Sequence, residues 1–152
     1  MATVRTSKFL IEQTVYTRRE LRDAFKIDDA TINNGIFQPN GHDSLWLFVT
    51  ENKTPDRVQY NDLLEDDVLQ MESQKLGRND QKMIEHSLND IEILLFYRKS
   101  KSAHPGAGFT YEGRFLYSSH SGSGLATFIF RREIGKGEEM PRLQTSRSEA
   151  LG

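Results

Sequence analysis

The stretch FTYEGRFLYSSHSGSGLATFIFRRE, Phe109 to Glu133, decides the fold of this 152-residue chain. It consists of two β-like runs, FTYEGRFLYSS and LATFIFRRE, which the short segment HSGSG joins. Two glycines among small hydroxyl residues are typical of a hairpin connection. We therefore expect SSHSGSG to lie at the turn of a β-hairpin.

The same segment contains the residue types of a Ser/His hydrolase, so this alternative was weighed against the hairpin. A nucleophile elbow needs Gly-x-Ser-x-Gly between a strand and a helix, together with a separate orienting acid. Here Ser123 lies in Ser-Gly-Ser-Gly and a second strand follows, so neither an elbow nor a phosphate loop before a helix fits. Ser119, His120 and Ser121 remain candidates for contacts to a phosphate backbone.

The rest of the chain predicts one α+β domain. Residues 16–27, YTRRELRDAFKI, predict a helix that Thr17 and Glu20 cap, with Arg18, Arg19 and Arg22 facing solvent. Strands are predicted at SLWLFVT (44–50), VLQMESQ (68–74) and IEILLFYRK (91–99), and KMIEHSL (82–88) is a short helix or an extended stretch. This order predicts a strongly bent sheet or a barrel. The domain is expected to span residues 1–133, and residues 134–152 to be a disordered tail or linker.

Composition fits a soluble globular protein of the cytosol, with 28% charged and 36% hydrophobic residues. No apolar run approaches the roughly 20 residues of a membrane span, and the N-terminus lacks the apolar core of a secretory signal. The chain has no cysteine, which excludes disulfides and thiolate metal sites.

Charge is distributed unevenly although the net charge is only −2. Residues 1–27 carry a net +3, residues 28–96 carry −9, and residues 97–133 carry +4. If the two basic ends meet in space, they form a modest basic face that suits a polyanion. Ordinary charge scatter is the alternative explanation.

A metal-dependent nuclease of the PD-(D/E)xK kind is an alternative that the sequence leaves open. Pro55-Asp56 and Asp80-Gln81-Lys82 match that pattern. Such a site needs its acids on adjoining strands, so that the carboxylates converge on Mg²⁺. Asp56 and Asp80 lie instead in polar, loop-like sequence, and the four histidines lack the spacing of metal ligands. We therefore predict no catalytic residue and no metal site.

The segment QYNDLLEDD, residues 59–67, places Tyr60 before several carboxylates and between two predicted strands. One interpretation is a solvated acidic loop in which Tyr60 is a half-buried anchor. The other is a pocket for a flipped base, in which an aromatic face stacks on the base. A carboxylate then accepts from the exocyclic amine of cytosine.

Taken together and in their order, these segments resemble the SRA domain (the YDG domain), a reader of modified cytosine in DNA. TYEGRFLY places Tyr111, Glu112 and Gly113 where the family has its Tyr-Asp-Gly motif, and GLATFIFRRE resembles the following strand, which ends in a basic pair. Upstream, SLWLFVT, QYNDLLEDD, VLQMESQKLGRND and IEILLFYRKSK follow the family's order. The resemblance covers about residues 16–133. More narrowly, the chain resembles the specificity modules of modification-dependent, McrA-like restriction endonucleases.

The resemblance implies a PUA/SRA-like twisted β-barrel with flanking helices and a concave pocket for a flipped base. Tyr60 falls where the family has a stacking aromatic. Asp62 falls near the carboxylate that reads the cytosine, and the alternatives for that role are Glu65, Asp66 and Asp67. Met71 stands where the family often has a second aromatic; the other candidates for this pocket are Trp46, Tyr111 and Gln74.

The same resemblance implies a rim that binds the DNA backbone. Lys75 and Arg78, after Gln74, are expected to fill the vacated space or to hold phosphates. Further backbone contacts are expected from Arg98, Lys99 and Lys101, and from the hairpin tip at Ser119, His120 and Ser121.

The function that follows is recognition, without catalysis, of double-stranded DNA that carries 5-methylcytosine or 5-hydroxymethylcytosine. The expected partner is a nuclease or helicase domain or subunit, in a cytoplasmic, nucleoid-associated protein without a cofactor and without membrane contact. The alternatives are the Mg²⁺ nuclease, a PUA-like reader of RNA or of another DNA modification, and a protein-interaction module in a defence complex.

Overall fold

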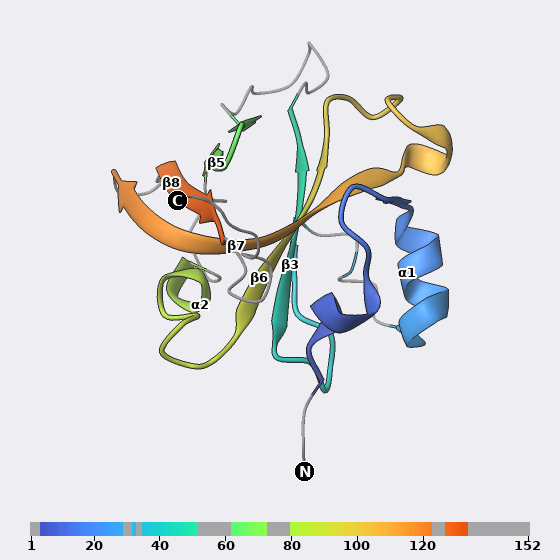
Figure 1. Ribbon diagram of the computed structural model, residues 1–152, viewed down its shortest axis with the longest axis horizontal. Coiled ribbons are helices and arrows are strands. Elements are labelled where there is room, and N and C mark those ends of the chain that lie inside the picture. The colour runs from blue at the N-terminus through green and yellow to red at the C-terminus, as the bar shows by residue number, and fades with distance from the viewer. Residues whose placement is uncertain are drawn as a thin grey trace, which may run out of the picture.

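An eight-stranded sheet forms the centre of the computed structural model, which describes residues 4–28, 32, 35–51, 62–72, 80–122 and 127–133 (Figure 1). Its strands are β1 (Val15–Tyr16), β2 (Ile36–Phe37), β3 (Ser44–Thr50), β4 (Leu63–Glu65), β5 (Val68–Glu72), β6 (Glu92–Arg98), β7 (Phe109–Ser121) and β8 (Thr127–Arg132). They lie in the order β2-β3-β6-β7-β8-β5-β4, with β1 paired to β7. The other elements are α1 (Arg18–Phe25), α2 (Asp80–Ile84), and 3-10 turns at Thr6–Phe9 and Pro105–Ala107.

The predicted twisted sheet with flanking helices is confirmed, but the sheet is not closed into a barrel within the described residues. The strands at the two ends of the sheet, β2 and β4, pair only with β3 and β5. These strands have two and three residues, so each presents few backbone groups with which another edge could pair.

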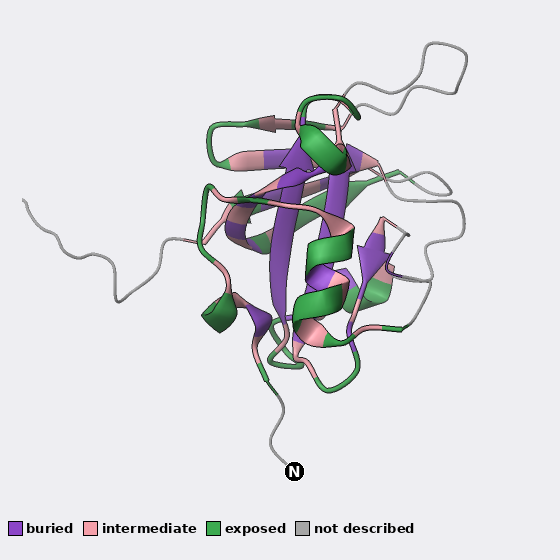
Figure 2. Cartoon of the chain, turned by 90° about the vertical axis from the view of Figure 1, so that its right-hand side faces the viewer, coloured by how far each residue is buried: buried purple, intermediate pink, exposed green. Residues whose placement is uncertain are grey.

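The parallel pair of β3 and β6 is the centre of the fold, from Ser44 opposite Glu92 to Thr50 opposite Arg98. Every residue of β6 is buried, as expected for an apolar parallel strand that is covered on both faces. One face packs on a cluster that includes Leu95 and Phe115, under β5, β8 and α2. The other face carries an aromatic cluster that α1 covers (Figure 2).

The predicted hairpin of residues 109–133 is confirmed. Strands β7 and β8 pair antiparallel from Phe115 opposite Arg132 to Ser121 opposite Thr127, so β7 runs further than the sequence predicted. Its register shifts near Gly113, which has a φ of +97°, and again between Tyr117 and Ser119. These irregularities bend β7 strongly and carry β8 and β5 over the core (Figure 1).

Helix α1 begins as predicted and differs from the prediction in its arginines. The Thr17 hydroxyl accepts the N–H of Glu20 at 3.0 Å, and the Glu20 carboxylate accepts the N–H of Thr17 at 2.9 Å. The helix ends at Phe25, because Lys26 adopts a left-handed conformation. Arg18 is half-buried over the ring of Phe48 rather than solvated.

A polar network ties the N-terminal segment to the start of β3 and β6. The nearly buried carboxylate of Glu92 accepts from the N–H and hydroxyl of Ser7, at 3.0 and 2.6 Å, and from the hydroxyl of Ser44 at 2.6 Å. Trp46 Nε1 donates to Thr6 Oγ1 at 3.1 Å, and that hydroxyl lies 2.5 Å from Nδ1 of His42. These contacts join the 3-10 turn at Thr6–Phe9 to His42, Trp46 and Glu92.

We expect the free energy of unfolding to fall as the pH drops below about 6.5. Burial lowers the pKa of His42 from its ordinary value of 6.5, although the charge of Glu92 works in the opposite direction. The unfolded chain therefore takes up the proton first. The stabilisation is complete above pH 6.5 and is lost as the pH falls towards the lower folded-state pKa.

Urea titrations between pH 5 and pH 8 measure this effect. The variant His42→Gln should show a flatter pH dependence than the wild type. His104→Gln is the control, because it makes the same substitution in the loop that follows β6, where His104 contacts Thr110 and lies outside the network of Thr6, His42 and Glu92. An equally steep dependence in the His42→Gln variant would contradict the assignment.

Candidate functional site

Asp62, immediately before β4, is at the centre of the predicted base pocket. Its Oδ1 accepts the backbone N–H of Glu72, the last residue of β5, at 3.0 Å. Because β4 and β5 pair antiparallel, this hydrogen bond closes the open end of their hairpin. Four other residues that were predicted for the pocket or its rim lie outside the described residues: Tyr60, Gln74, Lys75 and Arg78. The structure thus fixes the Asp62 carboxylate against the last residue of β5, Glu72.

The other three candidate carboxylates are placed less favourably than Asp62. Asp67 Oδ1 binds Nε of Arg132 at 2.7 Å, and Asp66 has a φ of +55° in the turn between β4 and β5. Glu65 is exposed on β4. Leu64 packs against the core, and the two-residue period of a strand gives Asp62 the same inward direction.

The candidates for a second stacking face are core residues in this structure. Trp46 and Tyr111 are 0% and 2% exposed, and Met71 is 6% exposed. Trp46 packs against the rings of Phe25, Phe37, Phe48 and Phe96, and Tyr111 packs against Tyr16 and Phe96. The alternation of β3 and β7 points both rings inward, so neither leaves a face for a base.

The hairpin tip lies at the same end of the sheet as Asp62. Ser121 pairs with Thr127, which pairs in turn with Glu72. Ser119, His120 and Ser121 are all exposed. The Nδ1 atom of His120 lies 2.6 Å from the hydroxyl of Tyr117, and its ring stacks on Phe128. The tip is therefore accessible, and its contact with DNA stays a prediction.

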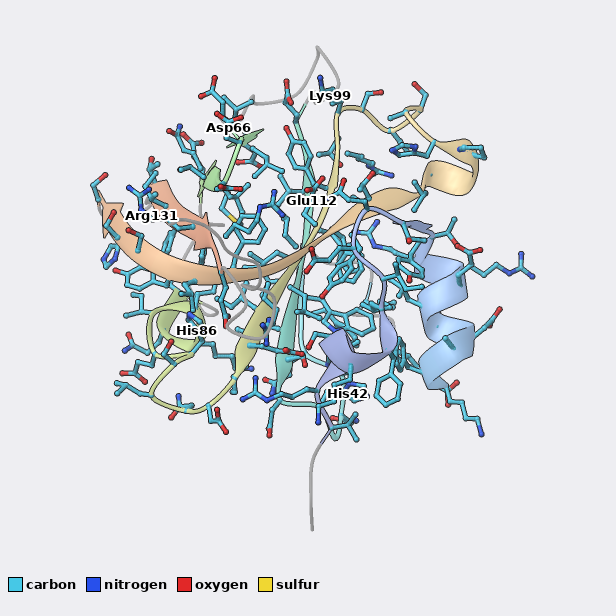
Figure 3. The ribbon with its side chains drawn as sticks, in the orientation of Figure 1. His42, Asp66, His86, Lys99, Glu112 and Arg131 are labelled. Carbon is cyan, nitrogen blue, oxygen red and sulfur yellow. The ribbon has the colours of Figure 1, made fainter. Side chains whose placement is uncertain are left out.

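A cavity of about 430 Å³ lies beside β4, between β6, β7 and the loop that follows β6. Asp66, Lys99 and Glu112 are among its lining residues and surround it in the upper part of Figure 3. Tyr97 lines this cavity. Its hydroxyl donates to the carboxylate of Glu51 and accepts the N–H of Leu64 at 3.3 Å. Burial, with the Glu51 hydrogen bond, raises the pKa of Tyr97, so the phenol stays protonated and joins β4 to β6.

Arg132, on β8, connects the turn between β4 and β5 to β7. Its guanidinium binds Asp67 and also Oε1 of Glu112, at 3.2 Å, and its Cζ lies 5.0 Å from the ring centroid of Phe115. Glu112 in turn accepts from Nε2 of Gln13 at 3.1 Å. The acid of the Tyr-Glu-Gly motif and one arginine of the basic pair are therefore structural: they hold the turn between β4 and β5 against β7.

The three basic residues after Tyr97 divide into two kinds. Lys99 and Lys101 are exposed, as backbone contacts require. Arg98 is only 8% exposed: its Nε donates to the Thr50 hydroxyl at 2.8 Å, and its Nη1 donates to the carbonyl of Ala107 at 2.7 Å. Arg98 therefore fastens the loop to the sheet, which the sequence analysis did not foresee.

The nuclease alternative finds no support in the part of the chain that the structure describes. Asp80 and Lys82 lie on helix α2 rather than on adjoining strands, and Asp56 is outside the described residues. No three His, Asp or Glu side chains among the described residues are grouped to hold a metal ion. None of the described helices is long and apolar enough to cross a membrane.

Comparison with known proteins gives the fold a name. No family model and no curated protein matches the sequence. Among solved structures, the chain is similar to the SUVH5 SRA domain in a complex with hemimethylated CG DNA. The TM-score is 0.53, with 19% identity over 89% of this chain and 99% of that chain. The SUVH5 SRA domain in a complex with methylated CHH DNA gives a TM-score of 0.49, with 18% identity over 83% and 96%. The first of these likenesses shows that the chain has the SRA fold.

Proposed function

We propose that this domain recognises double-stranded DNA that carries a modified base, by flipping that base into a pocket formed by Tyr60 and Asp62. The observation that carries the proposal is the hydrogen bond from Glu72, which holds the Asp62 carboxylate at the mouth of the β4–β5 hairpin. The SRA fold supports it, because the SUVH5 domain of that fold is in a complex with hemimethylated DNA.

The chemistry of the pocket suits cytosine. Its exocyclic amine is a donor and an ionised carboxylate only accepts, so Asp62 is complementary to the edge of this base. A hydrogen bond to a charged group contributes about 1.5–3 kcal/mol, and stacking on an aromatic ring contributes about 1–3 kcal/mol. Both are needed, because extruding the base costs a few kcal/mol. Backbone contacts from Lys75, Arg78, Lys99, Lys101 and the hairpin tip supply the remainder.

We further propose that the modified base is 5-methylcytosine or 5-hydroxymethylcytosine, and that the domain is the specificity module of a modification-dependent restriction system. The resemblance of its ordered segments to such modules supports this finer assignment. The module brings a nuclease or helicase domain or subunit to the modified DNA and has no catalytic residue of its own. Its place is then the cytoplasm, on the nucleoid.

Binding to three duplexes of one sequence tests the proposal. One duplex is unmodified, one carries 5-methylcytosine and one carries 5-hydroxymethylcytosine, each with 2-aminopurine beside the target base. We expect tighter binding to a modified duplex, with a rise in 2-aminopurine fluorescence as the base leaves the stack. Tyr60→Ala should weaken that binding about tenfold through the loss of stacking.

Phe9→Ala is the matched control, because Phe9 is an exposed ring (61%) on the 3-10 turn near the N-terminus. This variant should bind all three duplexes as the wild type does. Equal, weak binding of the wild type to all three would overturn the proposal for modified cytosine. Preference for single-stranded or duplex RNA competitors would favour the RNA-reading alternative.

A further inference from the structure

We propose that Arg18 and Arg98 together form a site for one phosphate group of the DNA backbone. The inference rests on the proposed function, because it takes DNA as the source of the phosphate. It assigns a binding role to α1, whose arginines were expected to be solvated.

Two arginines that are far apart in the sequence contact the same aromatic ring. The Cζ atom of Arg98 lies 4.0 Å from the ring centroid of Phe109, and the Cζ atom of Arg18 lies 5.1 Å from it. Arg18 also lies 4.4 Å from the centroid of Phe48, whose ring packs against Phe109 at 5.1 Å. The two rings form a platform on which both guanidinium groups are held.

Within the described part of the chain, neither arginine of this pair forms an ion pair with a carboxylate, although Asp23 and Asp28 line the hollow beside Arg18. Arg18 Nε donates to the carbonyl of Ile32 at 3.1 Å, and Arg98 donates to a hydroxyl and a carbonyl, so all three acceptors are uncharged. By contrast, Arg132 binds Asp67 and Glu112. A guanidinium has five N–H donors, so donors of both arginines remain for an anion.

Leaving two like charges together in a partly buried position is unfavourable. The pKa of Arg18 is lowered to about 10, first by burial and second by the charge of Arg98. A cation–π contact with an aromatic ring stabilises one guanidinium, but a second guanidinium beside the first adds electrostatic repulsion between the two charges. A phosphate between them offsets that repulsion, and its oxygens match the forked donors of arginine.

The two arginines also line two separate hollows of the surface. Arg98 lines the 430 Å³ cavity together with Leu64 of β4. Its carbonyl accepts the N–H of Glu51 at 3.0 Å. Arg18 lines a separate hollow of about 580 Å³ on α1, with Arg19, Arg22, Ile27 and the two carboxylates of Asp23 and Asp28. Helix α1 begins beside the loop that follows β6 (Figure 1), so Arg18 at its first position lies near the end of β6 that carries Arg98.

Salt-dependent binding of Arg18→Gln to the modified duplex tests the inference. We expect the variant to bind about tenfold more weakly at low salt, as for the loss of one charge-assisted contact. The slope of log Kd against log salt should fall in magnitude by about 1, the value for one phosphate contact. The loss should be the same for modified and unmodified duplexes, so their ratio is unchanged.

Neutral methylphosphonates, placed one at a time near the modified base, locate the contact. One position should weaken binding of the wild type and leave Arg18→Gln unaffected, which a purely structural role of Arg18 would not produce. Lys8→Gln removes one exposed charge from the 3-10 turn near the N-terminus and should change neither slope nor pattern. Arg18→Lys retains the charge and should keep most of the slope, and melting curves verify that each variant is folded.

The possible results separate the two proposals. If Arg18→Gln is folded and its affinity, slope and methylphosphonate pattern equal those of the wild type, the phosphate site is overturned while the reader function stands. If all duplexes bind alike but Arg18→Gln still loses affinity and slope, the phosphate site stands and modified-base recognition is overturned.

Discussion

Asp62→Asn is expected to weaken binding to a modified duplex about a hundredfold, to the level of the unmodified duplex. The asparagine oxygen still accepts the N–H of Glu72, which the wild-type carboxylate accepts at 3.0 Å, so the hairpin end is preserved. The second oxygen becomes an NH₂ group, which faces the exocyclic amine of cytosine as donor against donor. The loss therefore combines a charge-assisted hydrogen bond with an unsatisfied polar contact.

Asp66→Asn is the matched control for this change. Asp66 is exposed, four residues along the chain, and asparagine tolerates its left-handed φ of +55°. We expect its affinity for both duplexes, measured by fluorescence titration at fixed salt, to equal that of the wild type. If Asp66→Asn, and not Asp62→Asn, lost the preference for the modified duplex, the base would be read at the other end of β4.

The parts of the fold that the sequence predicted are those with a local physical signal. The apolar runs of residues 44–50 and 91–99 became β3 and β6, and the capping box at Thr17 and Glu20 starts α1. Strands β1, β2 and β4 have two or three residues, which is too short for a periodic pattern. The predicted closure into a barrel was wrong for the described residues, because closure depends on how two distant edges meet, which no local pattern indicates.

The errors in the candidate site arise because the prediction used residue type alone and ignored the direction in which each side chain points from its strand or helix. Arg98 was predicted as an exposed backbone contact from its charge alone, but it follows Leu94 and Phe96 at the two-residue period of the buried aromatic face, which makes it a structural residue as well. Trp46 was placed in the pocket although it alternates with Leu45 and Leu47 in a strand that is covered on both sides. Arg18 precedes Leu21 and Phe25 by three and seven residues, which puts it on the helix face that packs on the core.

Glu92→Ala is expected to lower the free energy of unfolding by about 3 kcal/mol, and the melting temperature by about 10 °C. The carboxylate is buried and accepts three hydrogen bonds, two from Ser7 and one from Ser44. Arg5 Nη1 lies 3.7 Å from Oε1 and supplies the compensating charge. Removing the acceptor leaves buried donors without a partner, which costs more than the bonds themselves contribute.

Urea denaturation measures this loss. Glu65→Ala is the control, because Glu65 is an exposed glutamate on β4, and its replacement should lower the free energy of unfolding by less than about 0.5 kcal/mol. A double-mutant cycle with Ser44→Ala should show coupling, since both changes remove the same hydrogen bond.

The pair of Ser44 and Glu92 begins the β3–β6 ladder, whereas Thr50 and Arg98 end it beside the cavity. DNA affinity per folded molecule should therefore stay at the wild-type value. A loss below 1 kcal/mol would mean that the N-terminal segment is not held by this carboxylate, and a loss of affinity would mean that the two ends of the ladder are coupled.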